Sequence, residues 1–164
     1  MIQLAIVTVS DSAVAGTRQD RSGPKLRERA EALGWIVEVQ ELVPDETSQI
    51  SAVLRRLADS GRFSVILTTG GTGVALRDVT PEATRAVIER EIPGVAEVMR
   101  AEGSKFTPLA ALSRALAGVR GRTVIINLPG SPKGAVESLD VISKLVPHMV
   151  DLLEGRTGHA DVPH

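Results

Sequence analysis

Hydrophobic and polar positions follow two different periods along this chain, and they predict strands and helices in alternation. Several short runs are apolar at most positions and rich in β-branched residues, which is typical of strands inside a sheet. Other segments repeat apolar residues every three or four positions, as Ile50, Val53, Leu54 and Leu57 do, which indicates the buried face of a helix. We expect strands at residues 2–10, 35–42, 65–69, 115–119 and 124–128.

Residues with strong preferences for helix ends set the limits of the helices. Ser22 is the expected N-cap of the first helix, and Gly34 the residue that terminates it. Thr80 is the expected N-cap of a later helix, because a proline and then an acidic residue follow it. We expect helices at about 22–33, 47–60 and 80–90, a short one ending at 102, and a last helical region from 132 that is bent near Pro147.

The order of these elements predicts the fold class. Arg120-Gly121-Arg122 separates two expected strands, and this spacing indicates a hairpin and hence one antiparallel strand. Strands that alternate with helices form mostly parallel sheets covered on both faces. We therefore expect an α/β protein with three α/β/α layers, a mostly parallel sheet and one antiparallel strand. The 164 residues fit a single domain over 1–155, with residues 156–164 as a flexible tail.

Composition and charge exclude several classes of partner. Hydrophobic residues make up 43% of the chain but aromatic residues only 2%, so stacking on nucleobases is not an expected mode of recognition. The 19 basic and 20 acidic residues form no long run of one sign, which argues against nucleic acid and membrane surfaces. The chain contains no cysteine, so disulfides and thiolate metal sites are excluded, and we expect a cytoplasmic protein.

Polar or glycine-rich segments follow four of the expected strands. In an open α/β sheet, ligands bind outside the carboxyl ends of the strands, so these segments are the candidates for a functional site. They are Ser10-Asp11-Ser12, residues 44–46, residues 70–73 with Arg77-Asp78, and residues 129–133.

Gly70, Gly71 and Gly73 form the first candidate binding element. Three glycines in four residues let the backbone approach a ligand closely and direct N–H groups at phosphate oxygens. A tight turn that requires positive φ explains the same glycines, and this alternative stays open. The segment lacks the third small residue of the dinucleotide fingerprint and the Gly-Lys-Ser/Thr ending of a P-loop. If it binds a nucleotide, it does so by another pattern.

Asp45 and Asp78 are the candidate metal ligands, because each follows the end of a strand. Two carboxylates from neighbouring loops suit a Mg²⁺ ion that bridges nucleotide phosphates. Alternatively, Asp45 caps the helix entered near Thr47, and Asp78 braces the turn before Thr80. Either aspartate alone favours the capping interpretation, whereas the pair beside a glycine loop favours the metal.

Two cations lie next to these elements. Lys133 is in the first turn of the last helical region, where the helix dipole disfavours a cation unless an anion is near. It is either a phosphate ligand or a solvated surface lysine. Arg77 either pairs with its neighbour Asp78 or faces phosphate.

Several of these segments together resemble a known family. Residues 68–73 (TTGGTG), 77–84 (RDVTPEAT) and 127–133 (NLPGSPK) are similar to the signature segments of the molybdopterin adenylyltransferases. These are the MogA/MoaB-like proteins of molybdenum cofactor biosynthesis, related to the G domain of gephyrin and to plant molybdenum-insertion proteins. Residues 10–12, 20–23 and 44–46 also fit, so the resemblance extends over about residues 4–155.

The resemblance implies an activity, reactants and an assembly. It implies transfer of AMP from ATP to the terminal phosphate of molybdopterin, with Mg²⁺, by a homotrimer or a dimer of trimers that could pass its product to a molybdenum-insertion protein. Asp45 and Asp78 become the catalytic, metal-binding pair. Ser10, Asp11, Ser12, Asp20 and Ser22 would lie towards the pterin, while Thr69, Gly70, Gly71, Thr72, Gly73, Pro129, Gly130, Ser131 and Lys133 would surround the nucleotide.

The resemblance leaves two functions to be separated. Some MoaB-type relatives and related scaffold domains lack the transferase activity and only bind the pterin. The presence of both Asp45 and Asp78 favours the enzyme.

Overall fold

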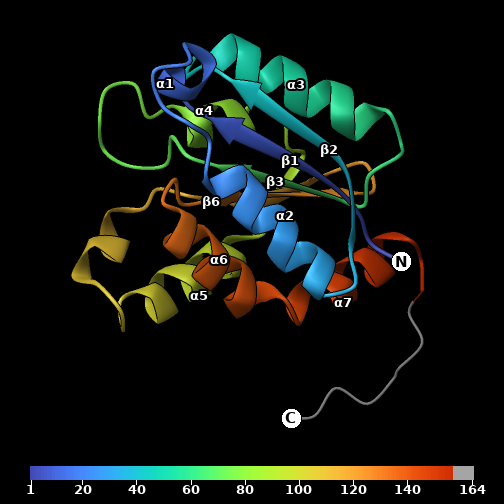
Figure 1. Ribbon diagram of the computed structural model, residues 1–164. Coiled ribbons are helices and arrows are strands. Elements are labelled where there is room, and N and C mark those ends of the chain that lie inside the picture. Colours follow the sequence, from blue (N-terminus) through green and yellow to red (C-terminus); the bar gives the residue numbers. More distant parts are fainter. Residues whose placement is uncertain (157–164) are drawn as a thin grey trace.

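A six-stranded sheet lies between two layers of helices (Figure 1), which confirms the expected fold class. The structure is a computed structural model, and it describes residues 1–156. The strand order is β2-β1-β3-β6-β5-β4, and β5 alone runs against the other strands of this sheet. The strands are β1 (Gln3–Val9), β2 (Ile36–Val43), β3 (Val65–Thr69), β4 (Arg90–Glu91), β5 (Ala117–Arg120) and β6 (Thr123–Leu128).

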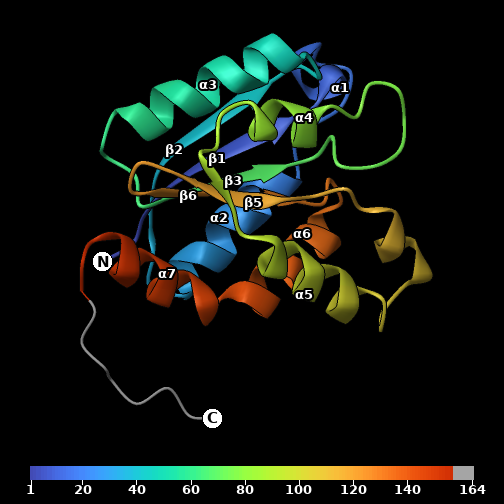
Figure 2. The same cartoon turned by 180° about the vertical axis from the view of Figure 1, so that it is seen from behind.

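The helices divide between the two faces of the sheet, as the two views in Figures 1 and 2 show. Aliphatic side chains fill both interfaces: Leu26, Leu139 and Val146 belong to one core, and Ile50 and Leu54 to the other. On the first face lie α2 (Ser22–Ala32), α5 (Pro93–Gly103), α6 (Pro132–Ile142) and α7 (Leu145–Leu153), and on the second α3 (Thr47–Asp59) and α4 (Thr80–Arg85). None of the helices in residues 1–156 has the length and apolar character needed to cross a membrane.

The expected N-caps of two helices are wrong by one residue. Arg21 occupies the N-cap of α2 without a capping side chain, and the Asp20 carboxylate instead accepts from the Gly23 N–H at 3.0 Å. Thr80 is the first residue of α4 rather than its cap, and its hydroxyl donates to the Gly70 carbonyl at 2.9 Å. At α4 a tertiary contact therefore uses the side chain expected to cap the helix, and at α2 the carboxylate of Asp20, just before the helix, satisfies a backbone N–H of its first turn.

Two helical limits also differ from expectation. Helix α4 ends at Arg85 rather than near residue 90, because residues 90–91 pair with β5 as the edge strand β4. The last helical region is interrupted at residues 143–144, between α6 and α7, and Pro147 lies in the first turn of α7.

Two short elements have no counterpart in the sequence pattern. Helix α1 (Asp11–Val14) occupies a segment that reads as polar loop, and a 3₁₀ turn, η1 (Pro108–Leu112), follows α5. The expected tail lies outside the described residues apart from Arg156, which pairs with Asp151 at 2.7 Å.

Candidate active site

The four candidate segments meet at one edge of the sheet. In the sheet register Val9 pairs with Val43, Thr8 with Thr69, and Thr69 with Leu128, so β2, β1, β3 and β6 end side by side. The chain leaves β1 for β2 on one side and passes from β3 towards β6 on the other. This divergence between β1 and β3 is the position at which open α/β sheets bind ligands.

Two adjoining cavities open at this edge. The first, of about 580 Å³, is called the polar cavity, and Asp11, Asp45 and Asp78 line it. The second, of about 480 Å³, is called the apolar cavity, because Met99 of α5, Leu109 of η1 and Phe106 between these elements line much of it. Four residues line both cavities: Gly71, Asp78, Gly130 and Ser131.

Almost all of the predicted site residues line one or both of the cavities. The polar cavity takes all five residues expected to face the pterin and also Thr69, Gly70 and Asp45. Thr72, Gly73 and Pro129 line the apolar cavity. Lys133 lines neither cavity: its side chain is 86% exposed, and Nζ lies 3.9 Å from Glu137. In the described structure Lys133 therefore has the surroundings of a solvated surface lysine.

Asp11, Asp45 and Arg77 form a hydrogen-bonded group at the polar cavity. The Asp11 N–H donates to the Asp45 carboxylate at 2.9 Å, and the Asp45 N–H donates to Asp11 Oδ1 at 3.0 Å. Arg77 donates to both Asp11 carboxylate oxygens, at 2.6 and 3.1 Å, and to Glu46 at 2.9 Å. Of the two alternatives for Arg77, pairing with Asp78 is therefore wrong, since its guanidinium bridges the loops after β1 and β2.

The two aspartates of this group have opposite electrostatic surroundings. The hydrogen bonds from Arg77 lower the pKa of the Asp11 carboxyl below its usual value. Burial raises the pKa of the Asp45 carboxyl, and the nearby charges of Asp11 and Asp78 raise it further. The Asp11 N–H and the charge of Arg77 compensate the negative charge of ionised Asp45 only in part, and a cation would stabilise it further.

The donor set fits Mg²⁺ delivered with a nucleotide. Within residues 1–156, no three His, Cys, Asp or Glu side chains are grouped to hold a metal ion. Mg²⁺ commonly binds one or two carboxylates and takes its other ligands from phosphates and water. Asp45 and Asp78, both half-buried and lining the polar cavity, would supply that number of carboxylates.

The capping alternative fails for Asp45 and holds for Asp78. Glu46 is the N-cap of α3, and no side chain caps that helix, so the interpretation of Asp45 as a cap is wrong. Asp78 does brace its turn, because its Oδ2 accepts from the Ala75 N–H at 3.0 Å. The bracing leaves the Asp78 side chain among those that line both cavities.

The turn interpretation is confirmed at two of the three glycines. Gly70 has φ +102° and Gly71 has φ +67°, values that residues with a Cβ rarely adopt. A Cβ on Gly71 would lie 2.3 Å from Thr80 Oγ1. Gly73 has no positive φ, and a Cβ there would meet only the Asp78 carboxylate, at 2.8 Å from Oδ2. Contact of these glycines with phosphate stays a prediction.

These differences give Gly71 and Gly73 separate experimental signatures. We expect Gly71→Ala to lower the free energy of unfolding by at least about 1–2 kcal/mol, because of its left-handed backbone. Gly73→Ala should cost no more than about 1 kcal/mol, the worth of the hydrogen bond between the Ala75 N–H and Asp78, but lose turnover, since its Cβ displaces the Asp78 carboxylate. Urea unfolding and steady-state rates measure the two effects. Full activity in Gly73→Ala would contradict a role for this carboxylate position.

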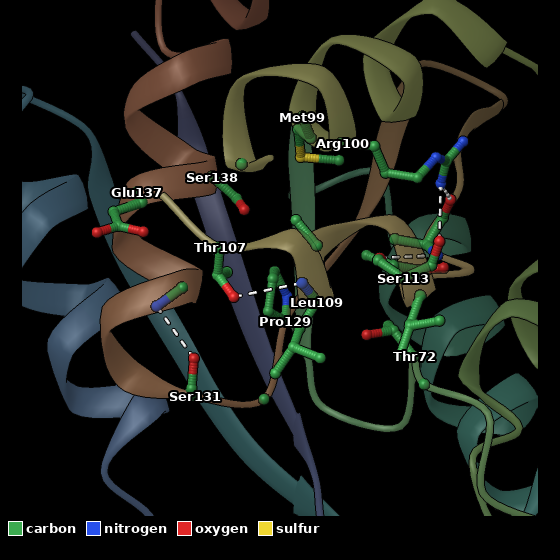
Figure 3. Close-up of a pocket in the computed structure, with 18 of the residues that line it drawn as sticks. Thr72, Met99, Arg100, Thr107, Leu109, Ser113, Pro129, Ser131, Glu137 and Ser138 are labelled. Carbon is green, nitrogen blue, oxygen red and sulfur yellow. Dashed lines mark hydrogen bonds between the residues drawn. The ribbon is translucent and has the colours of Figure 1, made fainter. Parts of the chain in front are cut away.

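The apolar cavity was missed by the sequence patterns. Figure 3 shows that its walls come from α5, through Met99 and Arg100, from the η1 region, through Leu109, and from α6, through Glu137 and Ser138. Apolar residues between the expected helix that ends at 102 and the expected strand that starts at 115 were the available signal, and Phe106, Leu109 and Leu112 are all more than half exposed. Such residues at a loop favour a ligand or partner.

Arg114 was also missed. It precedes β5 and contacts the loop that carries Asp78, although the two are far apart in sequence. Its guanidinium pairs with Glu82, and this ion pair lowers the pKa of the Glu82 carboxyl.

Comparison with known proteins decides the family. The model of the family described as "Probable molybdopterin binding domain" matches residues 5–148, which include the four strand ends beside the cavities. The chain belongs to this family. The resemblance seen in the sequence motifs is thereby confirmed.

Two named members of this family and one solved structure show how similar the chain is to known proteins. Molybdopterin adenylyltransferase of Helicobacter pylori is 41% identical over 94% of this chain and 89% of its own length. Molybdenum cofactor synthesis protein cinnamon of Drosophila melanogaster is 43% identical over 98% of this chain, which spans only 28% of that relative. The crystal structure of the molybdopterin biosynthesis enzyme MoaB from Thermus thermophilus is 52% identical, has a TM-score of 0.89, and aligns over 94% of this chain and 98% of its own.

Proposed function

We propose that this protein transfers AMP from ATP to the terminal phosphate of molybdopterin, releasing pyrophosphate. The observation that carries the proposal is the pair of adjoining cavities with Asp78, Gly71, Gly130 and Ser131 in their common wall. Relatives named molybdopterin adenylyltransferase are 40–43% identical over most of the chain, so the chain is a nucleotidyltransferase of molybdenum cofactor biosynthesis.

The two cavities suit the two halves of the product. The polar cavity offers hydroxyl and carboxylate groups at Ser10, Ser12 and Asp20, which match the hydrogen-bonding groups of a pterin. The apolar cavity offers Met99 and Leu109, which suit the faces of an adenine ring. The phosphates would then lie at the common wall, beside Asp78 and the N-terminus of α6.

The reaction requires positioning more than activation of a nucleophile. A phosphate oxygen of molybdopterin, already anionic at neutral pH, attacks the α-phosphorus of ATP, and the bond to the β-phosphate oxygen breaks. The described histidine, His148, is exposed and lines neither cavity, and this chemistry does not need it as a base. Mg²⁺ at Asp45 and Asp78 would neutralise the charge on the phosphates.

The chain's own groups would orient the two anions. The backbone N–H groups of residues 71–73 and of Lys133 in the first turn of α6 are candidates to donate to phosphate oxygens, whereas the Gly70 N–H already donates to the Leu128 carbonyl. Ser131 caps α6 by accepting from the Gly134 N–H at 3.1 Å, which fixes that turn at the common wall. Holding both reactants in one orientation removes most of the entropic part of the barrier.

Assembly and downstream partner belong to the same proposal. A homotrimer or a dimer of trimers, and transfer of the product to a molybdenum-insertion protein, follow from the family resemblance. Light scattering of the purified protein would establish the assembly.

A direct experiment tests the reaction. The purified protein is incubated with molybdopterin, ATP and Mg²⁺, and adenylylated molybdopterin is sought by chromatography and mass spectrometry. We expect product in proportion to the enzyme added. Absence of product from a folded protein that binds molybdopterin would contradict the proposal.

The second candidate is a pterin-binding scaffold without transferase activity. The family resemblance includes MoaB-type relatives that only bind the pterin, and the chain is 52% identical to a protein named molybdopterin biosynthesis enzyme MoaB. A scaffold would bind molybdopterin in calorimetry, yet ATP and Mg²⁺ in excess would yield no adenylylated product.

A further inference from the structure

The loop from Gly73 to Asp78 has little apolar packing to hold it in place. Residues 74–77 are all exposed, and the Leu76 side chain is 99% exposed. The loop nevertheless carries Asp78, whose carboxylate lies in the common wall of the two cavities. A segment without buried apolar contacts opens at low free-energy cost unless polar contacts fix it.

One arginine side chain bridges both ends of this loop. Arg114 Nε donates to the Gly73 carbonyl at 2.7 Å, and a terminal nitrogen donates to the Asp78 carbonyl at 2.6 Å. The other terminal nitrogen pairs with Glu82 at the start of α4, and the Arg114 backbone N–H donates to the Thr72 carbonyl at 2.8 Å. Each nitrogen of the guanidinium is thus bonded to the segment from 73 to 82.

The geometry points to Arg114 as a positioning residue for adenylyl transfer, a role that rests on the proposed function. Its planar guanidinium fixes the backbone at Gly73 and Asp78 together, and so fixes the direction of the Asp78 carboxylate. Arg114 lines neither cavity, so it acts through Asp78 and not on the substrate. Groups that orient a metal ligand from outside are commonly worth about 10–100-fold in activity or metal affinity.

Arg114→Lys is the sharpest variant, because lysine keeps the charge near Glu82 but cannot donate in the three directions of the fork. Arg120→Lys is its matched control. Arg120 also uses all its nitrogens, bonding Asp59 at 2.8 and 3.0 Å and the Val87 carbonyl at 3.0 Å, and it too lines neither cavity. A merely structural loss should affect both variants alike.

The experiment compares kcat, the KM for molybdopterin and the Mg²⁺ concentration for half-maximal rate in the wild type and both variants. We expect Arg114→Lys to lower kcat by about 10–100-fold and to raise the Mg²⁺ requirement, with the KM for molybdopterin within about twofold of wild type. Arg120→Lys should match the wild type in all three. Wild-type kcat and Mg²⁺ dependence in Arg114→Lys would overturn the inference.

Hydrogen exchange at residues 73–78, without substrate, measures the positioning independently of turnover. Faster exchange in Arg114→Lys than in Arg120→Lys is the expected result, and equal exchange overturns the inference. A wild-type protein that makes no adenylylated product contradicts the proposed function alone, because the exchange comparison still decides whether Arg114 fixes the loop.

Discussion

Asp45→Asn and Asp78→Asn should each reduce adenylyl transfer by at least about 100-fold while leaving the fold intact. Either substitution removes one of the two carboxylates proposed to hold Mg²⁺ at the polar cavity. An asparagine oxygen can still accept the Asp11 N–H at position 45 and the Ala75 N–H at position 78, so the local hydrogen bonds survive. Product formation per folded molecule is the measurement.

Stability distinguishes catalysis from a structural role at Asp45. A carboxyl whose pKa is raised in the folded state binds its proton more tightly there than in the unfolded chain, so folding loses stability as pH rises through that pKa. At neutral pH, Asp45→Asn removes this unfavourable charge and should unfold at the same or a higher urea concentration than wild type.

A surface variant is the control for both substitutions. Asp59→Asn removes a carboxylate that pairs with Arg120 away from both cavities, and its activity should stay near that of wild type. Near-normal activity in Asp45→Asn or Asp78→Asn would remove that residue from the mechanism.

Pyrophosphate should be released only when molybdopterin, ATP and Mg²⁺ are all present. Water is a weak substitute for a phosphate held beside the α-phosphorus, so ATP and Mg²⁺ alone should give little release. Omitting Mg²⁺ should stop the reaction, because the carboxylates of Asp45 and Asp78 would then repel the phosphates that they otherwise help to bind. A coupled pyrophosphate assay measures each omission.

The omission series also reports on competing activities. Equal pyrophosphate release with and without molybdopterin would identify an ATP pyrophosphohydrolase and contradict transfer to the pterin. Absence of release under every combination, with the pterin bound, would favour the scaffold.

The strands and their ends were predictable because the apolar pattern is unambiguous there. Residues 65–69 are buried at every position, and the polar segments that follow β1, β2, β3 and β6 converge because parallel strands end at a common edge. The regular geometry of a parallel sheet is enough to bring Ser10, Asp45 and Gly70 together from distant parts of the sequence.

The remaining features depend on long-range contacts that local patterns do not contain. Strand β4 is two residues long and exists because Arg90 and Glu91 pair with β5. Thr80 has the sequence context of a helix cap but donates to Gly70 instead. Arg114 gives no local signal of its bonds to Gly73 and Asp78, since it lies 36 residues beyond Asp78.

The most direct test of the central claim follows the α-phosphate of ATP. The purified protein is incubated with Mg²⁺, molybdopterin and ATP labelled at the α-phosphate, and in parallel with ATP labelled at the γ-phosphate. Adenylyl transfer predicts that the α-label becomes attached to molybdopterin in a one-to-one ratio, while the γ-label leaves in pyrophosphate. Molybdopterin that is bound by the protein but gains no α-label would contradict the account.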